Sequence, residues 1–233
     1  MPDDRNVLEV IACSVVDAIE AEKGGANRLE VVRDLQRGGL TPSWELVKEI
    51  KQAVNLPLRV MLRESEGYEM KDEDEINRLC RAAERFASLG IDGFVLGFLR
   101  RGEVDDELTQ RVLACAPHVP ATFHHAFEDT NDKWRAVMQI KRLLPQVDRI
   151  LSSGGTDELE QRVRALYANR RAAGVELIIV AGGGIDGDAI LKIGREAFIR
   201  EFHVGRAARS NFRVEGDVQA SLVSALSQKL KEI

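Results

Sequence analysis

The sequence is poor in the features that mark several large classes of protein. Its 233 residues include only 3 cysteines and 6 prolines, and Cys13, Cys80 and Cys115 show no CxxC spacing, which argues against a disulfide framework or a structural zinc site. Acidic residues outnumber basic ones by 38 to 33, for a net charge of −5, so no overall positive field attracts nucleic acid or an anionic membrane. The longest apolar runs fall far short of the roughly 20 residues that a membrane-spanning helix needs.

The N-terminus, Met1-Pro2-Asp3-Asp4, is acidic where a signal peptide is basic. Together with the small number of cysteines, this predicts a cytoplasmic protein with no membrane and no nucleic-acid partner. The composition, 44% hydrophobic and 30% charged, is that of a globular chain that buries a sizeable core.

The pattern along the chain favours an α/β fold. Short apolar runs alternate with longer segments of helical period, which is typical of βα units on a parallel sheet. The runs are 7–12, 28–32, 58–63, 93–96, 121–125, 149–152, 176–180 and 199–204. Eight units without an obvious linker predict a single (β/α)8 TIM barrel over residues 1–233. The alternative is an open doubly wound sheet, but the nucleotide fingerprint GxGxxG is missing after the first run.

Alternating hydrophobicity predicts which side chains of each strand face the barrel interior. Five polar residues have inward parity and stand late in their strands, near the end where barrel enzymes place their chemistry. These candidate catalytic residues are Glu9, Glu30, Arg63, His124 and His203. Arg59 and Glu201 stand early in their strands, so buried ion pairs are the better interpretation for them. His125 has outward parity and is not expected to be a catalyst.

Glycine-rich segments follow several of the predicted strands. In many barrels the loops after strands seven and eight bind phosphate through unpaired backbone N–H groups. We therefore predict an anion site formed by Ser153, Gly154, Gly183, Gly184, Gly205 and Arg206. The alternative is that these glycines only allow tight turns.

Several motifs resemble the CutC family, whose members have long been called copper homeostasis proteins. They are Leu8-Glu9, Gly25-Ala26-Asn27-Arg28-Leu29-Glu30, Gly38-Gly39-Leu40-Thr41-Pro42-Ser43, Thr122-Phe123-His124 with Ala126-Phe127, Ser152-Ser153-Gly154 and Ala181-Gly182-Gly183-Gly184. The resemblance runs from the first strand to about His203. It implies a cytoplasmic TIM barrel that forms homo-oligomers, such as a dimer, and that has a role in copper tolerance or Cu(I) binding.

The sequence departs from this family where copper binding is concerned. Family members often carry cysteines at the end of the first strand and directly after the Glu of the second, where this chain has Ile11, Ala12 and Val32. Cu(I) prefers thiolate and thioether ligands. The remaining candidate metal ligands are Cys13, Met61, His124 and His203.

Two hypotheses about function remain open at this point. The first is a copper-binding protein without turnover. The second is an enzyme that acts on a small anionic or phosphorylated metabolite by Glu and His acid-base chemistry, with Arg63 holding an anionic oxygen. In the second case the same carboxylates and histidines are also candidate ligands of another divalent metal such as Zn²⁺ or Mn²⁺. A Schiff-base aldolase is disfavoured because all nine lysines fall in helical or loop segments.

Overall fold

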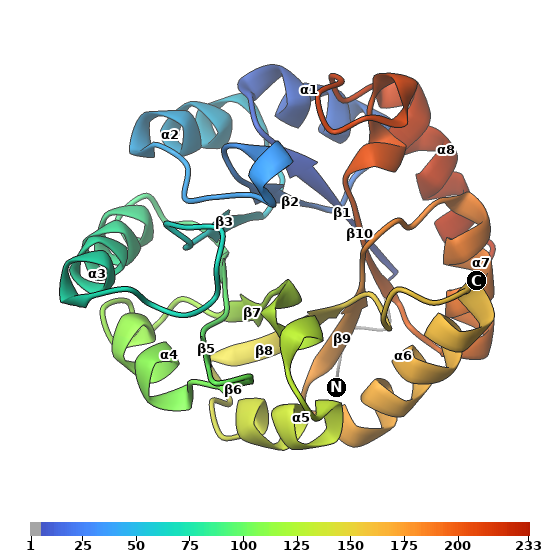
Figure 1. The fold of residues 1–233 in the computed structure, drawn as a ribbon. Coiled ribbons are helices and arrows are strands. Elements are labelled where there is room, and N and C mark those ends of the chain that lie inside the picture. Colours follow the sequence, from blue (N-terminus) through green and yellow to red (C-terminus); the bar gives the residue numbers. More distant parts are fainter. Residues whose placement is uncertain (1–5) are drawn as a thin grey trace.

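The computed structural model describes residues 6–233 and contains a closed barrel of eight parallel strands, which confirms the predicted (β/α)8 TIM barrel (Figure 1). The barrel strands are β1 (Val7–Ala12), β2 (Arg28–Val31), β3 (Leu58–Met61), β4 (Gly93–Leu96), β7 (Ala121–Phe123), β8 (Val147–Ser152), β9 (Ile178–Ala181) and β10 (Glu201–Val204). They pair in this order, and β10 pairs with β1 to close the ring. Each of the eight predicted runs overlaps one barrel strand.

Helices surround the barrel on its outer side (Figure 1). They are α1 (Val15–Gly24), α2 (Trp44–Ala53), α3 (Glu73–Ala87), α4 (Asp106–Leu113), α5 (Lys133–Lys141), α6 (Leu159–Ala173), α7 (Gly187–Glu196) and α8 (Ala220–Leu230). Short 3-10 helices lie in the loops: η1 (Leu35–Arg37), η2 (His125–Asp129), η3 (Arg206–Ala208) and η4 (Ser210–Phe212). No helix within residues 6–233 is long and apolar enough to cross a membrane.

The outer face of the barrel forms the main core. Leu8, Val10, Phe94, Leu96 and Phe202 have no solvent exposure. In β1 and β10 these residues alternate with Glu9 and His203, which have inward parity. The helices contribute a matching apolar stripe: in α3 the buried residues include Ile76, Leu79, Ala83 and Phe86, which recur every three or four residues. Burial of these two faces against each other stabilises the layered arrangement.

A short antiparallel hairpin, β5 (Leu99–Arg100) with β6 (Glu103–Val104), follows β4 and lies outside the barrel sheet. Its turn contains Arg101 and Gly102, which both have positive φ, 55° and 74°. Two strands of two residues are too short for alternating hydrophobicity to reveal them. The sequence therefore gives no sign of this hairpin.

The strand register brings distant polar residues together. Glu9 on β1 is directly opposite Arg28 on β2 and His203 on β10. Glu30, two residues further along β2, is opposite Ile11 on β1 and Arg59 on β3. Because the barrel closes between its first and last strands, residues from both ends of the chain share one polar interior.

Candidate functional site

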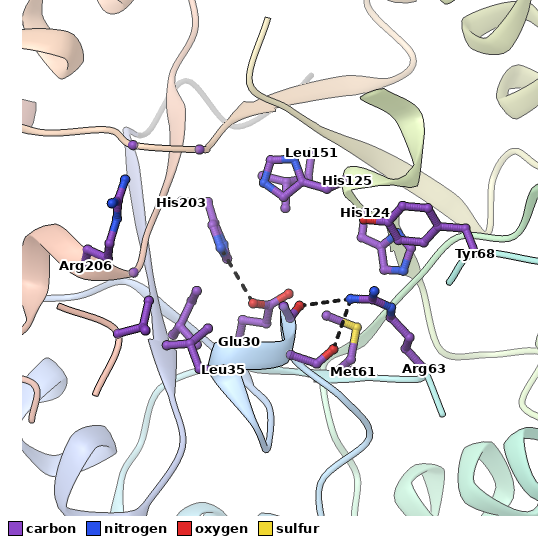
Figure 2. A pocket seen from close by; sticks show the side chains of 17 residues that line it. Glu30, Leu35, Met61, Arg63, Tyr68, His124, His125, Leu151, His203 and Arg206 are labelled. Atoms are coloured by element: carbon purple, nitrogen blue, oxygen red, sulfur yellow. Dashed lines mark hydrogen bonds and ion pairs between the residues drawn. The ribbon is translucent and has the colours of Figure 1, made fainter. Parts of the chain in front are cut away.

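A cavity of about 400 Å³ opens at the end of the barrel where the strands terminate (Figure 2). This size is typical of a small-molecule site. Four of the five predicted catalytic residues line it: Glu30, Arg63, His124 and His203. The fifth, Glu9, does not line the cavity but contacts His203 from below. No lysine is among the described residues that line the cavity.

Beneath the cavity, the barrel floor holds a network of buried ion pairs. Arg28 binds Glu9 through Nε and Glu201 Oε2 through Nη2, the latter at 2.7 Å. Arg149 binds the same Glu201 carboxylate with Nε at 2.8 Å. Arg59 donates to Thr122 Oγ1 at 2.8 Å and to Asp148 Oδ2 at 3.0 Å. The prediction that Arg59 and Glu201 form structural ion pairs is therefore confirmed.

His203 connects this floor network to the cavity. Its Nδ1 lies 2.8 Å from Glu9 Oε1, and its Nε2 lies 3.6 Å from Glu30 Oε2. Burial lowers the pKa of His203, but the two carboxylates outweigh burial and raise it above its ordinary value. For Glu9, burial raises the pKa, while Arg28 and His203 outweigh burial and hold the pKa well below its ordinary range. Glu9 therefore remains ionised and fixes the imidazole orientation.

Glu30 is the carboxyl group with the most unusual environment in the cavity. Burial raises its pKa to about 7, with His203 opposing and Glu9 adding to the shift. Its Oε1 atom is buried and has no hydrogen-bond partner within the described part of the chain. A buried carboxyl that titrates near neutral pH and has an unused oxygen is a candidate general acid or base.

Arg63 is held in the cavity by carbonyl groups instead of carboxylates. Its guanidinium Nη1 donates to Gly38 O at 3.1 Å and Gly39 O at 3.4 Å (Figure 2). The Nη2 group donates to Glu66 O. The ring of Tyr68 lies 4.8 Å from the guanidinium carbon. Within residues 6–233 no carboxylate forms an ion pair with Arg63, and its buried Nε lacks a partner. The positive charge is thus available to an anionic ligand.

The loop that holds Arg63 requires glycine. Gly38 has a φ of 81°, and a Cβ atom at this position would lie 3.0 Å from Arg63 Nη1. A larger residue at this position would therefore suffer both backbone strain and a clash with the guanidinium. This explains the glycine at position 38.

His124 lines the cavity and carries a hydrogen-bond donor without a partner within residues 6–233. Its Nδ1 accepts the backbone N–H of Ala126 at 3.2 Å, so the proton of a neutral imidazole is carried by Nε2. Burial lowers the pKa of His124 well below its ordinary value, and the charge of Arg63 adds to this effect. The Nε2 atom is buried without a partner among the described residues. Gly97 provides the space, because a Cβ there would lie 2.7 Å from Nδ1.

The expectation that His125 faces away from the site is wrong. The β7 strand ends at Phe123 and the chain enters the 3-10 helix η2, so strand parity no longer applies at His125. The His125 side chain lines the cavity between His124 and His203 (Figure 2). Burial lowers its pKa to about 4, with the charge of His203 adding to the shift, so the imidazole is neutral at physiological pH.

The predicted anion-binding residues divide into two groups. Gly183, Gly184, Gly205 and Arg206 line the cavity, whereas Ser153 and Gly154 are not among its lining residues. The N–H of Ser153 is already bound to Glu128 Oε1 at 2.6 Å, and the N–H of Gly154 to Ser152 Oγ at 3.1 Å. These donors are therefore occupied by the protein itself.

The candidate copper ligands do not form a suitable donor set. Met61, His124 and His203 line the cavity, but Cys13 does not. Burial raises the pKa of the Cys13 thiol to about 11, so it is protonated near neutral pH, and Arg209 Nη2 contacts its Sγ at 3.6 Å. In the described part of the chain, no group of three or more His, Cys, Asp and Glu side chains is arranged to hold a metal ion. The residues present do not fit a Cu(I) thiolate centre.

The fold and the cavity define a (β/α)8-barrel protein with a cavity lined by polar residues at the C-terminal end of its strands. The model of the CutC family matches residues 6–208, and the chain belongs to this family. A human relative named copper homeostasis protein cutC homolog is 33% identical over 199 residues, which cover 84% of this chain and 72% of the human protein. A CutC family protein of Xylella fastidiosa strain Temecula1 is 32% identical over 204 residues, covering 87% and 75% of the two chains.

A crystal structure of a CutC protein from Streptococcus agalactiae shares the fold with a TM-score of 0.79. Its sequence is 24% identical, and the match covers 85% of this chain and 97% of the other.

Proposed function

We propose that this protein is an enzyme that transfers a proton to and from a carbon atom of a small anionic substrate. The substrate binds in the cavity at the barrel mouth, where the strands terminate. The observation that carries this proposal is Glu30: a buried carboxyl whose pKa is about 7, 3.6 Å from His203 and with one oxygen unpartnered within residues 6–233. A general base with a pKa near the working pH combines a useful ionised fraction with adequate basicity.

The surrounding groups supply the other requirements of such a reaction. Ionised Glu30 accepts a proton from a carbon next to a carbonyl group, and the electron pair of the broken C–H bond moves to the carbonyl oxygen. The His124 Nε2–H and the Arg63 guanidinium are donors for the negative charge that develops on this oxygen. Protonated Glu30 then returns a proton to the substrate carbon, which completes the exchange. His203, fixed by Glu9, is a positioning residue that faces Glu30 Oε2.

A copper-handling role is suggested by the names of the human and mouse relatives. The donor set argues against Cu(I) binding at this cavity, because Cys13 is protonated and lies outside the lining. Another divalent ion is also disfavoured there. The His203 nitrogens face Glu9 and Glu30, and His124 Nδ1 is occupied by a backbone N–H. The cytoplasmic location and the homo-oligomeric state remain predictions.

The experiment is hydrogen exchange in D₂O, followed by NMR with a panel of small anionic carbonyl compounds. We expect the protein to exchange the C–H next to the carbonyl of at least one compound, and Glu30→Gln to reduce the rate by about a hundredfold or more. Glu84→Gln, at an exposed position of α3, is the matched control and should exchange at the wild-type rate. Absence of exchange by the wild type across the panel, or equal rates for wild type and Glu30→Gln, would contradict the proposal.

A further inference from the structure

The cavity carries two arginines on opposite sides of its opening. Arg63 lies beside Tyr68 and His124, and Arg206 lies beyond His203 on the other side (Figure 2). Arg206 is exposed, and its guanidinium forms no ion pair or hydrogen bond with any group within residues 6–233. Two cations without carboxylate partners, in a chain whose net charge is −5, make this opening locally positive.

The backbone next to Arg206 offers free donors. The N–H groups of Gly183, Gly184 and Gly205 take part in none of the hydrogen bonds formed among residues 6–233. Arg162 Nη2 binds the carbonyl oxygens of Gly182 at 3.2 Å and Gly183 at 2.6 Å. In a trans peptide the N–H points opposite to the C=O, so the N–H groups of Gly183 and Gly184 point away from Arg162, which does not line the cavity.

Neutral His125 adjoins the same loop. A Cβ on Gly182 would lie 3.5 Å from His125 Nε2, and one on Gly183 would lie 3.6 Å from its Cε1. Neither ring nitrogen of His125 has a hydrogen-bond partner in the described chain. The buried Oε1 of Glu30 and Nε2 of His124 are also unpartnered there, which independently indicates that this cavity receives a polar ligand.

We infer that Arg206, His125 and the N–H groups of Gly183, Gly184 and Gly205 form a subsite for a tetrahedral oxyanion, so that the substrate is a phosphate monoester. This inference rests on the proposed function, since it places the phosphate on one side of the mouth and the reacting carbon near Glu30 and Arg63. A phosphate group has three terminal oxygens and up to two negative charges, which match three N–H donors and a guanidinium better than a carboxylate does. Ser153 and Gly154 are not part of this subsite, because Glu128 and Ser152 occupy their N–H groups.

The test is titration of the ¹⁵N-labelled protein with inorganic phosphate, followed through the backbone amide signals. We expect the largest changes at Gly183, Gly184 and Gly205, and about tenfold or greater weakening in Arg206→Gln. Arg171→Gln, at an exposed position of α6, should bind phosphate as the wild type does. Changes confined to other residues, no binding, or equal affinity of wild type and Arg206→Gln would overturn the subsite.

Acetate distinguishes the class of anion. We expect acetate to bind the same amides at least about tenfold more weakly than phosphate, and equal affinity would overturn the phosphate assignment. Titration of the Glu30 carboxyl in the same samples separates this inference from the proposed function. If phosphate fails to bind while Glu30 titrates near pH 7, only the subsite is wrong. If phosphate binds while Glu30 titrates near its ordinary value, the proposed function is wrong and the subsite stands.

Discussion

The barrel floor and the barrel mouth, which is the cavity at the end where the strands terminate, both contain arginine and glutamate side chains. The two regions differ in how these side chains are paired. On the floor, Arg28 and Arg149 each bind carboxylates, and Glu201 accepts from both. In the mouth, Arg63 is held by carbonyl oxygens, and Glu30 keeps an unpartnered oxygen among the described residues. The floor thus pairs each arginine with a carboxylate, although Asp148 Oδ1 is buried without a partner among the described residues. The mouth instead leaves arginines without a carboxylate partner among the same residues. The two regions therefore differ in how their charged groups are paired, whereas Arg28 on the floor and Arg63 in the mouth are buried to a similar degree.

The largest expected effect concerns the floor. Arg28→Ala removes a buried partner from both Glu9 and Glu201, and leaves Glu9 with His203 and Glu201 with Arg149. We expect a loss of about 3 to 5 kcal/mol in the free energy of unfolding, measured by urea denaturation. Arg206→Gln in the mouth should change this free energy by less than about 0.5 kcal/mol, because Arg206 is exposed and unpaired. Similar losses in the two variants would remove the distinction between floor and mouth.

The second prediction concerns the pH dependence of stability. Since the pKa of Glu30 is raised from 4.5 to about 7 in the folded protein, the folded state retains a proton that the unfolded state loses over this range. Stability from this group is therefore full below about pH 4.5 and is lost as the pH rises to about 7. Glu30→Gln should become progressively more stable than the wild type across this interval, by up to about 3 kcal/mol.

This second prediction is measured as the difference between the two unfolding free energies at each pH. The difference is needed because the pKa values of His203, His124 and His125 are also shifted in the folded protein, and these shifts contribute to the pH dependence of both variants. A difference that stays constant from about pH 4.5 to pH 8 would show that Glu30 has an ordinary pKa.

Sequence patterns predicted the barrel and most of the mouth. Alternation along strands placed Glu30 and His203 inward, because the strands around them have apolar residues at every second position. The pattern failed where regular structure ends. His125 lies after the end of β7 at Phe123, where the alternation of a strand no longer predicts the direction of a side chain. Tyr68 lies in an irregular segment between β3 and α3 that has no periodicity.

Side-chain contacts over long sequence separations were also beyond prediction. Glu128 accepts the N–H of Ser153, 25 residues later in the chain, and so removes a loop from the predicted anion site. The sequence around Gly154 gives no sign of this contact, because a glycine-rich loop can have the same sequence whether its backbone N–H groups are free or hydrogen-bonded. Whether such a loop can bind an anion depends on whether its N–H groups already have partners within the protein.

A third and smaller effect is expected for His125→Asn. The folded-state pKa of His125 is lowered to about 4, so between this value and its ordinary pKa only the unfolded state takes up a proton. The wild type therefore loses stability as the pH falls through this range. His125→Asn should gain about 1 to 2 kcal/mol relative to the wild type at about pH 5 and nothing from this source at about pH 8. An equal effect at both pH values would show that His125 is not held neutral.

The smallest expected effect concerns copper. Because the Cys13 thiol is protonated near neutral pH and lies outside the cavity lining, Cys13→Ser should leave the Cu(I) affinity unchanged in competition with a Cu(I) chelator. We also expect this affinity to be weaker than that of relatives with cysteines at the positions of Ala12 and Val32. If the Cu(I) affinity equals that of such a relative and is abolished in Cys13→Ser, the prediction is wrong and the protein has a Cu(I) site that includes Cys13.

The most direct test of the account is the titration of the Glu30 carboxyl carbon by ¹³C NMR, assigned by comparison with Glu30→Gln. The mouth contains an acid-base group only if this buried carboxyl exchanges its proton near neutral pH. We predict a midpoint at about pH 7. A midpoint near the ordinary glutamate value of 4.5 would contradict the central claim, because Glu30 would then be a fully ionised partner of His203 and the mouth would resemble the floor.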